Sequence, residues 1–166
     1  MESSYSGKAL IRAIVIATTI AGTLDILSAF VFAIMAGGSP LGVLRGIGGA
    51  IVDSESYDRF VLAGIGLALH FAIMTAMATV YLLVASWIRL VNRLAVLSGV
   101  GYGLVLWGVM YWIVLPRRWP TMFPIDPTRE PKEIAMQLFS HIVLVGIPIA
   151  LVARAAARWR FASDTY

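Results

Sequence analysis

The chain of 166 residues is 60% hydrophobic and only 13% charged, whereas soluble domains average about 45–50% and about 25%. A soluble domain of this length could not bury so much apolar surface in one core, but lipid can cover the outside of a membrane bundle. The composition therefore predicts an integral membrane protein whose first partner is the lipid bilayer. Cysteine is absent, which excludes disulfides and thiolate metal sites. The 13 Lys and Arg residues lie beside predicted helix ends and form no basic face with interleaved aromatics, so we expect no nucleic-acid partner.

Four apolar stretches are each long enough to cross a bilayer as a helix. They cover about residues 9–36, 61–88, 94–115 and 134–153. A tight basic connection from Arg89 to Arg93 joins the second and third stretches as an antiparallel hairpin. The predicted fold is all-α, a bundle of four transmembrane helices that forms a single domain over residues 1–166. Because the number of spans is even, both termini lie on one side.

The basic residues set the orientation by a small excess. One face carries seven of them: Lys8, Arg12, Arg89, Arg93, Arg154, Arg158 and Arg160. The opposite face carries six: Arg45, Arg59, Arg117, Arg118, Arg129 and Lys132. Under the positive-inside rule this predicts cytoplasmic termini. Trp87 and Trp159 near that boundary, with Trp112 and Trp119 near the outer one, indicate an aromatic belt.

The first outer connection contains a short helix. Ser39-Pro40 is an N-cap followed by proline at the first helical position. The apolar run Leu41–Val52 that follows is too short to span, so we expect an interfacial or re-entrant helix on the outer side. An acidic patch then marks the return to water, with Ser54 or Ser56 as the expected N-cap of the second span.

The second outer connection, Pro116–Lys132, holds five of the seven prolines. Proline fixes φ and removes a donor, so the pattern predicts an extended and stiff segment. Such a segment either seals the end of the bundle or acts as a lid.

Two stripes of small residues indicate close helix packing. Gly99 and Gly103 form a Gly-x-x-x-Gly pair in the third span, and the second span carries Ala72, Thr75, Ala76 and Thr79 on one face. The stripes can pack within the chain or between chains. A homo-oligomer or a larger membrane complex is therefore an expected assembly.

Asp25 stands in the middle of the first apolar stretch, on a small polar face with Thr18 and Ser28. A carboxylate at that depth costs roughly 2.5–3.5 kcal/mol on insertion scales and needs a partner inside the bundle. The two histidines of the chain, His70 and His141, also lie within spans. Counted from the outer ends, Asp25, His70 and His141 are about 11, 10 and 7 residues deep, which agrees to about 6 Å at 1.5 Å per residue. We therefore expect the three side chains to meet in one half of the bundle.

Four neighbours extend this cluster. Gln137 lies one turn before His141 and can reach inward. Met74 and Met77 share a helix face with His70, which suits a soft metal, although methionine at this spacing is more often core filler. Pro148 removes a backbone donor on the face of His141 and frees a carbonyl within the fourth span.

Four interpretations of the cluster stay open. It is a buried Asp–His pair that fixes helix register, or a site that handles a small solute, an ion or a proton. Alternatively, His70 and His141 ligate a b-type haem, or the histidines and Asp25 bind a metal ion, with Met74 and Met77 as further candidates. Finally, the chain is a non-catalytic structural or accessory subunit. The sequence shows no nucleophile elbow, no paired carboxylates and no His-rich boxes, so we do not expect an enzyme.

Several different short motifs are distributed along nearly the whole chain. They are Thr23-Leu-Asp25, Ser39-Pro-Leu, Leu69-His70-Phe71, Gly101-Tyr-Gly103, Leu115-Pro116, Ser140-His141 and Gly146-Ile-Pro148. Together they resemble a family of small four-span bacterial inner-membrane proteins with no assigned activity. The resemblance implies a bacterial inner membrane and carries over no catalytic or binding role.

Overall fold

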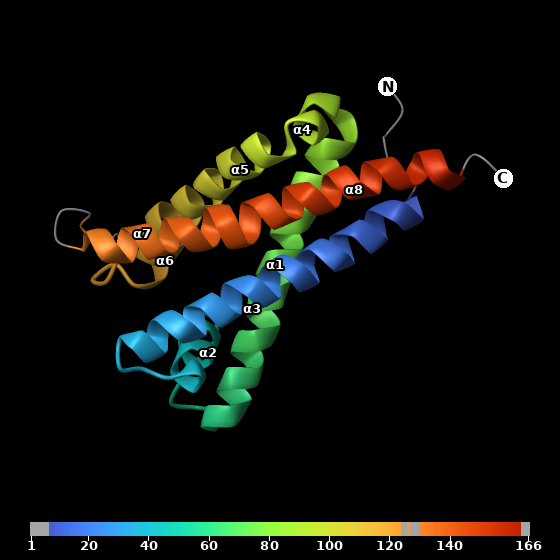
Figure 1. Ribbon diagram of the computed structural model, residues 1–166. Coiled ribbons are helices and arrows are strands. Elements are labelled where there is room, and N and C mark those ends of the chain that lie inside the picture. The colour runs from blue at the N-terminus through green and yellow to red at the C-terminus, as the bar shows by residue number, and fades with distance from the viewer. Residues whose placement is uncertain (1–6, 124–125, 127–129, 164–166) are drawn as a thin grey trace.

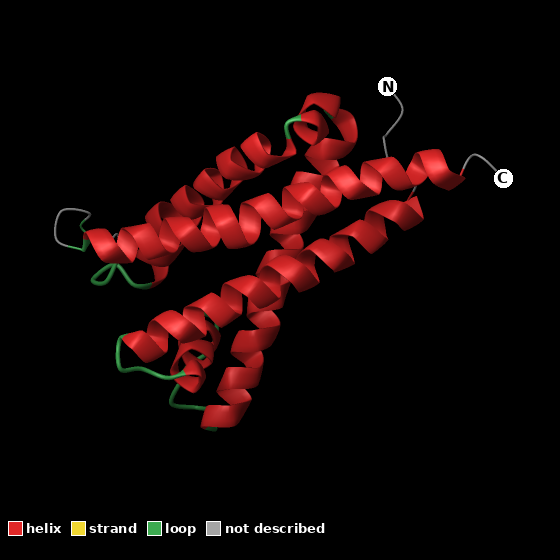
Figure 2. Cartoon of the chain, in the orientation of Figure 1, coloured by secondary structure: helices red, strands yellow, loops and turns green. Residues whose placement is uncertain are grey.

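The computed structural model describes residues 7–123, 126 and 130–163, with side chains as far as Arg158. Its helices are α1 (Gly7–Met35), α2 (Pro40–Gly48), α3 (Arg59–Trp87), α4 (Arg89–Arg93), α5 (Ala95–Val109), η1 (Met110–Val114), α6 (Leu115–Arg118), α7 (Pro131–Phe139), η2 (Ser140–Gly146) and α8 (Ile147–Ser163). No strand occurs in this described part of the chain (Figure 2). The segments α5–η1–α6 and α7–η2–α8 each run without a break.

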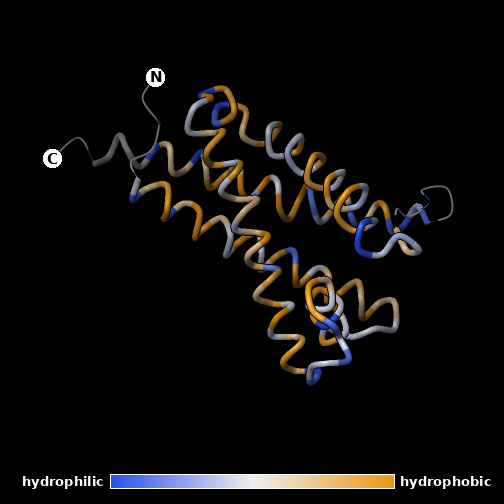
Figure 3. The backbone as a smooth tube through the Cα atoms, turned by 180° about the vertical axis from the view of Figure 1, so that it is seen from behind, coloured by the Kyte–Doolittle hydropathy of each residue, from blue (hydrophilic) through white to orange (hydrophobic). Residues whose placement is uncertain are grey.

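Four helices are long and apolar enough to cross a membrane: Gly7–Met35, Arg59–Trp87, Ala95–Arg118 and Pro131–Arg158. The protein is therefore a multi-pass membrane protein with an all-α four-helix bundle, and the predicted fold class is confirmed. In Figure 3 hydrophobic residues run along the helices, while hydrophilic residues gather where helices end. Large apolar side chains also cover the outside, among them Ile11, Val15, Leu27, Val31 and Ile34, as expected of a surface that faces lipid.

The bundle is open at one end. The start of α1, the end of α8 and α4 lie at one end of the molecule, and α2, α6 and α7 lie toward the other, which we call the α2 end (Figure 1). The helix α3 crosses α1 and α8 at a steep angle, and its first half diverges from α5 and α6 toward the α2 end (Figure 1). Long side chains bridge α3 and α5 near α4, where Tyr81 Oη lies 2.7 Å from Ser98 Oγ.

The glycine pair of α5 packs within the chain. A Cβ on Gly103 would lie 2.6 Å from Ile142 Cα, and one on Gly99 would lie 2.8 Å from Ile147 Cα. Gly146 faces Gly103 in return, since its Cβ would lie 2.8 Å from the Gly103 nitrogen. Three glycines therefore let the backbones of α5 and the fourth span touch.

The stripe of small residues on the second span lies on the surface of the bundle. Ala72, Thr75 and Ala76 are exposed and Thr79 is half-exposed on the outer face of α3. Both threonine hydroxyls donate to carbonyls of their own helix, at 2.7 Å to Phe71 O and at 2.7 Å to Thr75 O. The stripe therefore does not pack inside the bundle, and its use between chains stays a prediction.

Helix ends in the first connection follow local chemistry. The chain leaves α1 through Gly37 at φ 80°, with Gly38 N–H bonded to Ala33 O at 2.8 Å and Gly37 N–H to Ile34 O at 3.0 Å, a Schellman turn. Ser39 caps α2 as predicted, accepting from the Gly42 N–H at 3.1 Å. Glycine also seats α2 on α3, since a Cβ on Gly66 would lie 2.9 Å from the Gly48 nitrogen. Whether α2 lies at the membrane interface stays a prediction.

The predicted cap of the second span is wrong. Asp58 caps α3, its carboxylate accepting from Phe60 N–H at 2.8 Å. Ser56 instead donates to the Asp53 carboxylate at 2.9 Å, and Glu55 N–H does so at 3.2 Å. These two donors hold the pKa of Asp53 below its ordinary value. The Asp53 carboxylate therefore keeps its charge further into acidic solution. Asp58, the residue directly before the helix, takes the cap.

The prediction for the Pro-rich connection is partly wrong. The third span does not end at residue 115 but continues through α6 to Arg118, with Pro116 near the start of that short helix. Pro131 likewise opens α7. Pro131 stands in the first turn of a helix, where the missing N–H costs nothing, whereas Pro116 lies inside the continuous third span, where the missing N–H has to be accommodated. Pro124 and Pro127 lie outside the described residues.

The tryptophans divide between surface and interior. Trp87 and Trp112 are exposed, as an aromatic belt requires. Trp119 is half-buried and lines a cavity. The side chain of Trp159 lies outside the described residues.

We expect Gly103→Ala to destabilise the bundle and Gly101→Ala not to. The new methyl group on residue 103 would overlap the Ile142 backbone, whereas a Cβ on Gly101 meets nothing within 4 Å. Overpacking of this kind costs about 1–3 kcal/mol, or about 2–4 °C of Tm per kcal/mol at this chain length. Thermal unfolding in detergent measures both variants. Equal midpoints would show that α5 and the fourth span are not in backbone contact.

Candidate intramembrane binding site

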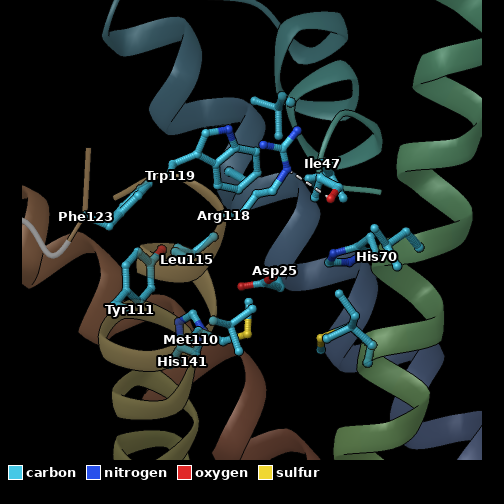
Figure 4. A pocket seen from close by; sticks show the side chains of 18 of the residues that line it. Asp25, Ile47, His70, Met110, Tyr111, Leu115, Arg118, Trp119, Phe123 and His141 are labelled. Atoms are coloured by element: carbon cyan, nitrogen blue, oxygen red, sulfur yellow. Dashed lines mark hydrogen bonds between the residues drawn. The ribbon is translucent and has the colours of Figure 1, made fainter. Parts of the chain in front are cut away.

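A cavity of about 570 Å³ lies between the diverging halves of the bundle. Its walls come from α3 on one side and from η1, α6 and the turn after α6 on the other, with α1 and η2 between them and α2 at the end (Figure 4). Most lining side chains are apolar. The polar and aromatic ones are Asp25, His70, His141, Tyr111, Arg118, Trp119 and Phe123. Asp25 lies ten residues, or about 15 Å of helix, from the end of α1 at Met35.

Two bridges between the halves bound this cavity. Toward α4, Tyr102 Oη donates to Met77 O at 2.7 Å and ties α5 to α3. At the α2 end, Arg118 Nη2 donates to Gly49 O at 2.8 Å and its Nε to Ala50 O at 3.1 Å. The Arg118 guanidinium thus satisfies carbonyls at the C-terminal end of α2, where a positive charge is favoured. Between the two bridges, α3 and the third span stand apart and leave the cavity open sideways.

Asp25 projects into this cavity from α1. Figure 4 shows its carboxylate between His70 on one side and Tyr111, Met110 and His141 on the other. Among the described residues, no side chain or backbone N–H hydrogen-bonds this carboxylate, and none forms an ion pair with it. The predicted convergence of Asp25, His70 and His141 on one cavity is found, but the predicted Asp–His hydrogen bond is not.

His70 is tied to the backbone of α1. Its Nε2 lies 2.9 Å from Gly22 O, and because a carbonyl can only accept, Nε2 carries the proton. The contact needs a close approach of α1 and α3, and Gly22 permits it, since a Cβ there would lie 2.8 Å from the Phe71 ring. His70 is buried and stacks edge-on with Phe71, the ring centroids being 5.2 Å apart.

His141 is tied to its own helix. Its Nδ1 donates to Gln137 O at 3.1 Å, which leaves Nε2 as the nitrogen without a hydrogen-bond partner in the described chain. The ring packs edge-on against Tyr111, with centroids 5.5 Å apart. Tyr111 in turn lies 6.0 Å from the Phe123 ring, centroid to centroid. An aromatic wall therefore faces Asp25 from the third span.

Two π-helical turns carry Tyr111 and His141. In η1 the Leu115 N–H bonds to Met110 O, and in η2 the Ile147 N–H bonds to Ile142 O, five residues back in each case. Each turn ends two residues before a proline, Pro116 or Pro148. Because proline lacks an N–H and crowds the preceding turn, the helix widens there. Widened turns of this kind are frequent at functional sites.

A second cavity, of about 250 Å³, lies behind Asp25 between α1 and α7–η2. Ser28 and Gln137 line it. Ser28 Oγ donates to Asp25 O at 2.8 Å and lies 2.9 Å from Ser140 Oγ, while Gln137 Oε1 accepts from Trp107 Nε1 at 3.1 Å. Both side chains therefore reach inward as predicted, but they bond neighbours and not the carboxylate.

Of the remaining predicted site residues, two line the main cavity and one does not. Met74 and Met77 line the main cavity. Thr18 is buried two turns from Asp25, lines neither cavity, and its hydroxyl has no hydrogen-bond partner among the described residues. Thr18 is therefore not part of this site.

The sequence prediction missed Tyr111, Arg118, Trp119 and Phe123. A sequence signal for Tyr111 was its place within two helical turns before a proline. Tyr111 precedes Pro116 by five residues, and His141 precedes Pro148 by seven. Nothing in the sequence indicated that Arg118 would bond α2, some 70 residues earlier in the chain.

A metal ion or a haem would place geometric requirements on these residues. In the described part of the chain no three His, Asp or Glu side chains lie close enough together to hold a metal ion. A haem held by both histidines would need His70 Nε2, which the Gly22 carbonyl occupies. Ligation would therefore require α1 and α3 to separate.

No family model, curated protein or solved structure matches this chain.

We expect Arg118→Ala to open the α2 end of the cavity. The chain has no cysteine, so Ala29→Cys, at a position lining both cavities, gives a single reporter thiol. Without the Arg118 bonds to α2, a water-soluble thiol reagent should modify this reporter several-fold faster. The matched control is Arg117→Ala, because Arg117 bonds only Ile113 O of its own turn among the described residues, at 3.2 Å. Equal rates in the two variants would show that the Arg118 bridge does not close the cavity.

Proposed function

We propose that this protein holds a small solute inside the membrane, with the Asp25 carboxylate as the binding group, and exchanges it through the open side of the cavity. One observation carries the proposal: the Asp25 carboxylate projects into a largely apolar cavity of about 570 Å³ and makes no hydrogen bond or ion pair among the described residues. Cavities of about 300–1,000 Å³ with few convergent polar groups are typical of small-molecule sites. On this proposal the protein handles a solute within the membrane.

The energetic cost of Asp25 favours a role in binding. A carboxylate within a span costs roughly 2.5–3.5 kcal/mol, and the neighbours that could offset this cost bond elsewhere. His70 donates to Gly22 O and His141 to Gln137 O. A group whose cost is not offset within the fold is typical of a functional site, where the ligand supplies the missing interaction.

A purely structural role for the Asp25 cluster is the main rival. It requires an Asp–His hydrogen bond that locks helix register, whereas His70 joins α3 to α1 through the Gly22 carbonyl and His141 bonds a carbonyl of its own helix. The register of α3 on α1 is therefore already fixed without Asp25. Conduction of bare ions is the second rival, but the apolar lining offers few oxygen ligands to replace a hydration shell.

The expected setting is a bacterial inner membrane with both termini in the cytoplasm. The excess of seven basic residues over six and the family resemblance support this placement. In that orientation the α2 end, with Arg118 across the mouth of the cavity, faces the outside of the cell. The exposed small-residue stripe of α3 remains a surface through which two copies could associate.

We expect a hydrophobic carbodiimide to label Asp25. Dicyclohexylcarbodiimide enters membranes and reacts with carboxyl groups in apolar surroundings, where the carboxyl O–H adds across one C=N bond and the acylisourea rearranges to a stable N-acylurea. Intact-mass spectrometry of the protein in lipid nanodiscs should show one adduct, and peptide mapping should place it at Asp25. Asp25→Asn removes the adduct, while Asp58→Asn, which changes a water-exposed cap, leaves it. A lack of labelling in the wild type would contradict an accessible binding carboxylate.

We expect Asp25→Asn to raise the thermal stability of the empty protein. The substitution replaces a carboxylate by a neutral amide, which costs less to bury in apolar surroundings, so the Tm should rise by about 2–4 °C per kcal/mol recovered. The matched control is Tyr102→Phe, which loses the donor to Met77 O and should lower the Tm. Both midpoints come from thermal unfolding in the same detergent. A clear drop for Asp25→Asn would support the structural role instead.

A further inference from the structure

We infer that the solute is a hydrophobic monocation: an amine or other onium group that carries an apolar body. The inference deepens the proposed function and rests on it, because it takes Asp25 as the binding group. Three features of the cavity carry it, namely the charge at its centre, the aromatic wall opposite, and the nature of its lining.

The charge at the centre is negative. Asp25 is the acidic side chain that lines the cavity, and the nearby ring protons of His70 and His141 are directed at backbone carbonyls. The cationic Arg118 stands at the mouth, bonded to Gly49 O and Ala50 O, and no ion pair joins it to Asp25 in the described structure. A cation inside the cavity would therefore pair with Asp25 in surroundings of low dielectric, where the attraction is strong.

The aromatic wall suits the same charge. Tyr111 and Phe123 lie side by side across the cavity from α1, and Trp119 stands next to them at the Arg118 end (Figure 4). Aromatic faces attract cations, most strongly where water is excluded, and cages of such rings recognise quaternary ammonium groups. An anion placed here would instead meet the negative faces of the rings and the Asp25 carboxylate.

The lining suits an apolar body of variable shape. Four of the seven methionines of the chain line the cavity, Met74, Met77, Met110 and Met122. Methionine side chains are flexible and polarisable, and they adapt to ligands of different outline. The lateral opening between α3 and the third span would admit such a ligand from the bilayer itself, in which hydrophobic cations concentrate.

Two ions of nearly identical shape and opposite charge test the inference. Tetraphenylphosphonium is a permanent monocation, and tetraphenylborate is its anionic counterpart. Equilibrium dialysis against the full chain in neutral-lipid nanodiscs, with empty nanodiscs subtracted, measures saturable binding of each. We expect one phosphonium site per chain, an affinity at least tenfold higher than for borate, and protection of Asp25 from carbodiimide by phosphonium.

Matched variants assign the binding to named groups. Asp25→Asn should weaken phosphonium binding at least tenfold, which corresponds to about 1.4 kcal/mol, while Asp25→Glu keeps the charge and should retain it. Tyr111→Leu removes the ring and should bind phosphonium several-fold more weakly than Tyr111→Phe, which keeps it. Thermal unfolding of each variant confirms that the fold is intact. Asp58→Asn, at the cap of α3, should have no effect.

The outcomes separate the inference from the proposed function. Equal or tighter binding of borate, or phosphonium binding that Asp25→Asn leaves unchanged, would overturn the assignment of a cationic solute. If neither ion binds saturably but the carbodiimide still labels Asp25, the solute class is wrong while the binding role of Asp25 stands. If the carbodiimide also fails to react, the proposed function fails with it.

Discussion

The constraint on which the rest of the structure depends is that hydrocarbon offers no hydrogen-bond partner, so each polar group in a span must find one within the chain. The described residues obey it almost throughout. Histidine, tyrosine and tryptophan side chains of the spans bond carbonyls or a side-chain amide, as His70 does to Gly22, Tyr102 to Met77 and Trp107 to Gln137. These bonds cross between helices and fix how the helices meet. Thr18 and Asp25 are exceptions: the Thr18 hydroxyl has no hydrogen-bond partner among the described residues, and the Asp25 carboxylate, which also makes no such bond there, lies where the bundle opens into a cavity.

The same constraint explains the prolines of the third and fourth spans. A proline inside a membrane helix removes one N–H and leaves a carbonyl to be satisfied. Here each helix responds with a π-helical turn immediately upstream, η1 before Pro116 and η2 before Pro148. The wider turns shift the helix faces, and they hold Tyr111 and His141 in contact with each other beside Asp25. The prolines of these spans thus determine where nearby side chains point. The two π-helical turns before them shape one wall of the cavity.

How much of this could be predicted from sequence depends on the range of the interaction. The four spans, the Ser39 cap and the shared depth of Asp25, His70 and His141 follow from composition, local chemistry and counting, and they were predicted. The cavity and its Arg118 bridge depend on the steep crossing of α3, which no local pattern encodes. The two small-residue stripes make the same point: Gly103 meets the fourth span, whereas Ala72 and Thr75 face outward. Composition alone could not distinguish them, because a stripe predicts that two helices can approach and not which ones do.

The arrangement of hydrogen bonds also bears on why Asp25 has no partner. A lone carboxylate in a span could be neutralised cheaply by one nearby donor, and three lie close in Ser28, His70 and His141. Each is instead engaged by a neighbouring backbone carbonyl, Ser28 by that of Asp25 itself. The donors are thereby turned away from the carboxylate, which stays available on the cavity side. A fold optimised only for stability would pair these groups. In the proposed function, leaving them apart raises the energy of the empty protein and a bound cation would lower it, which is the energetic pattern expected of a binding site.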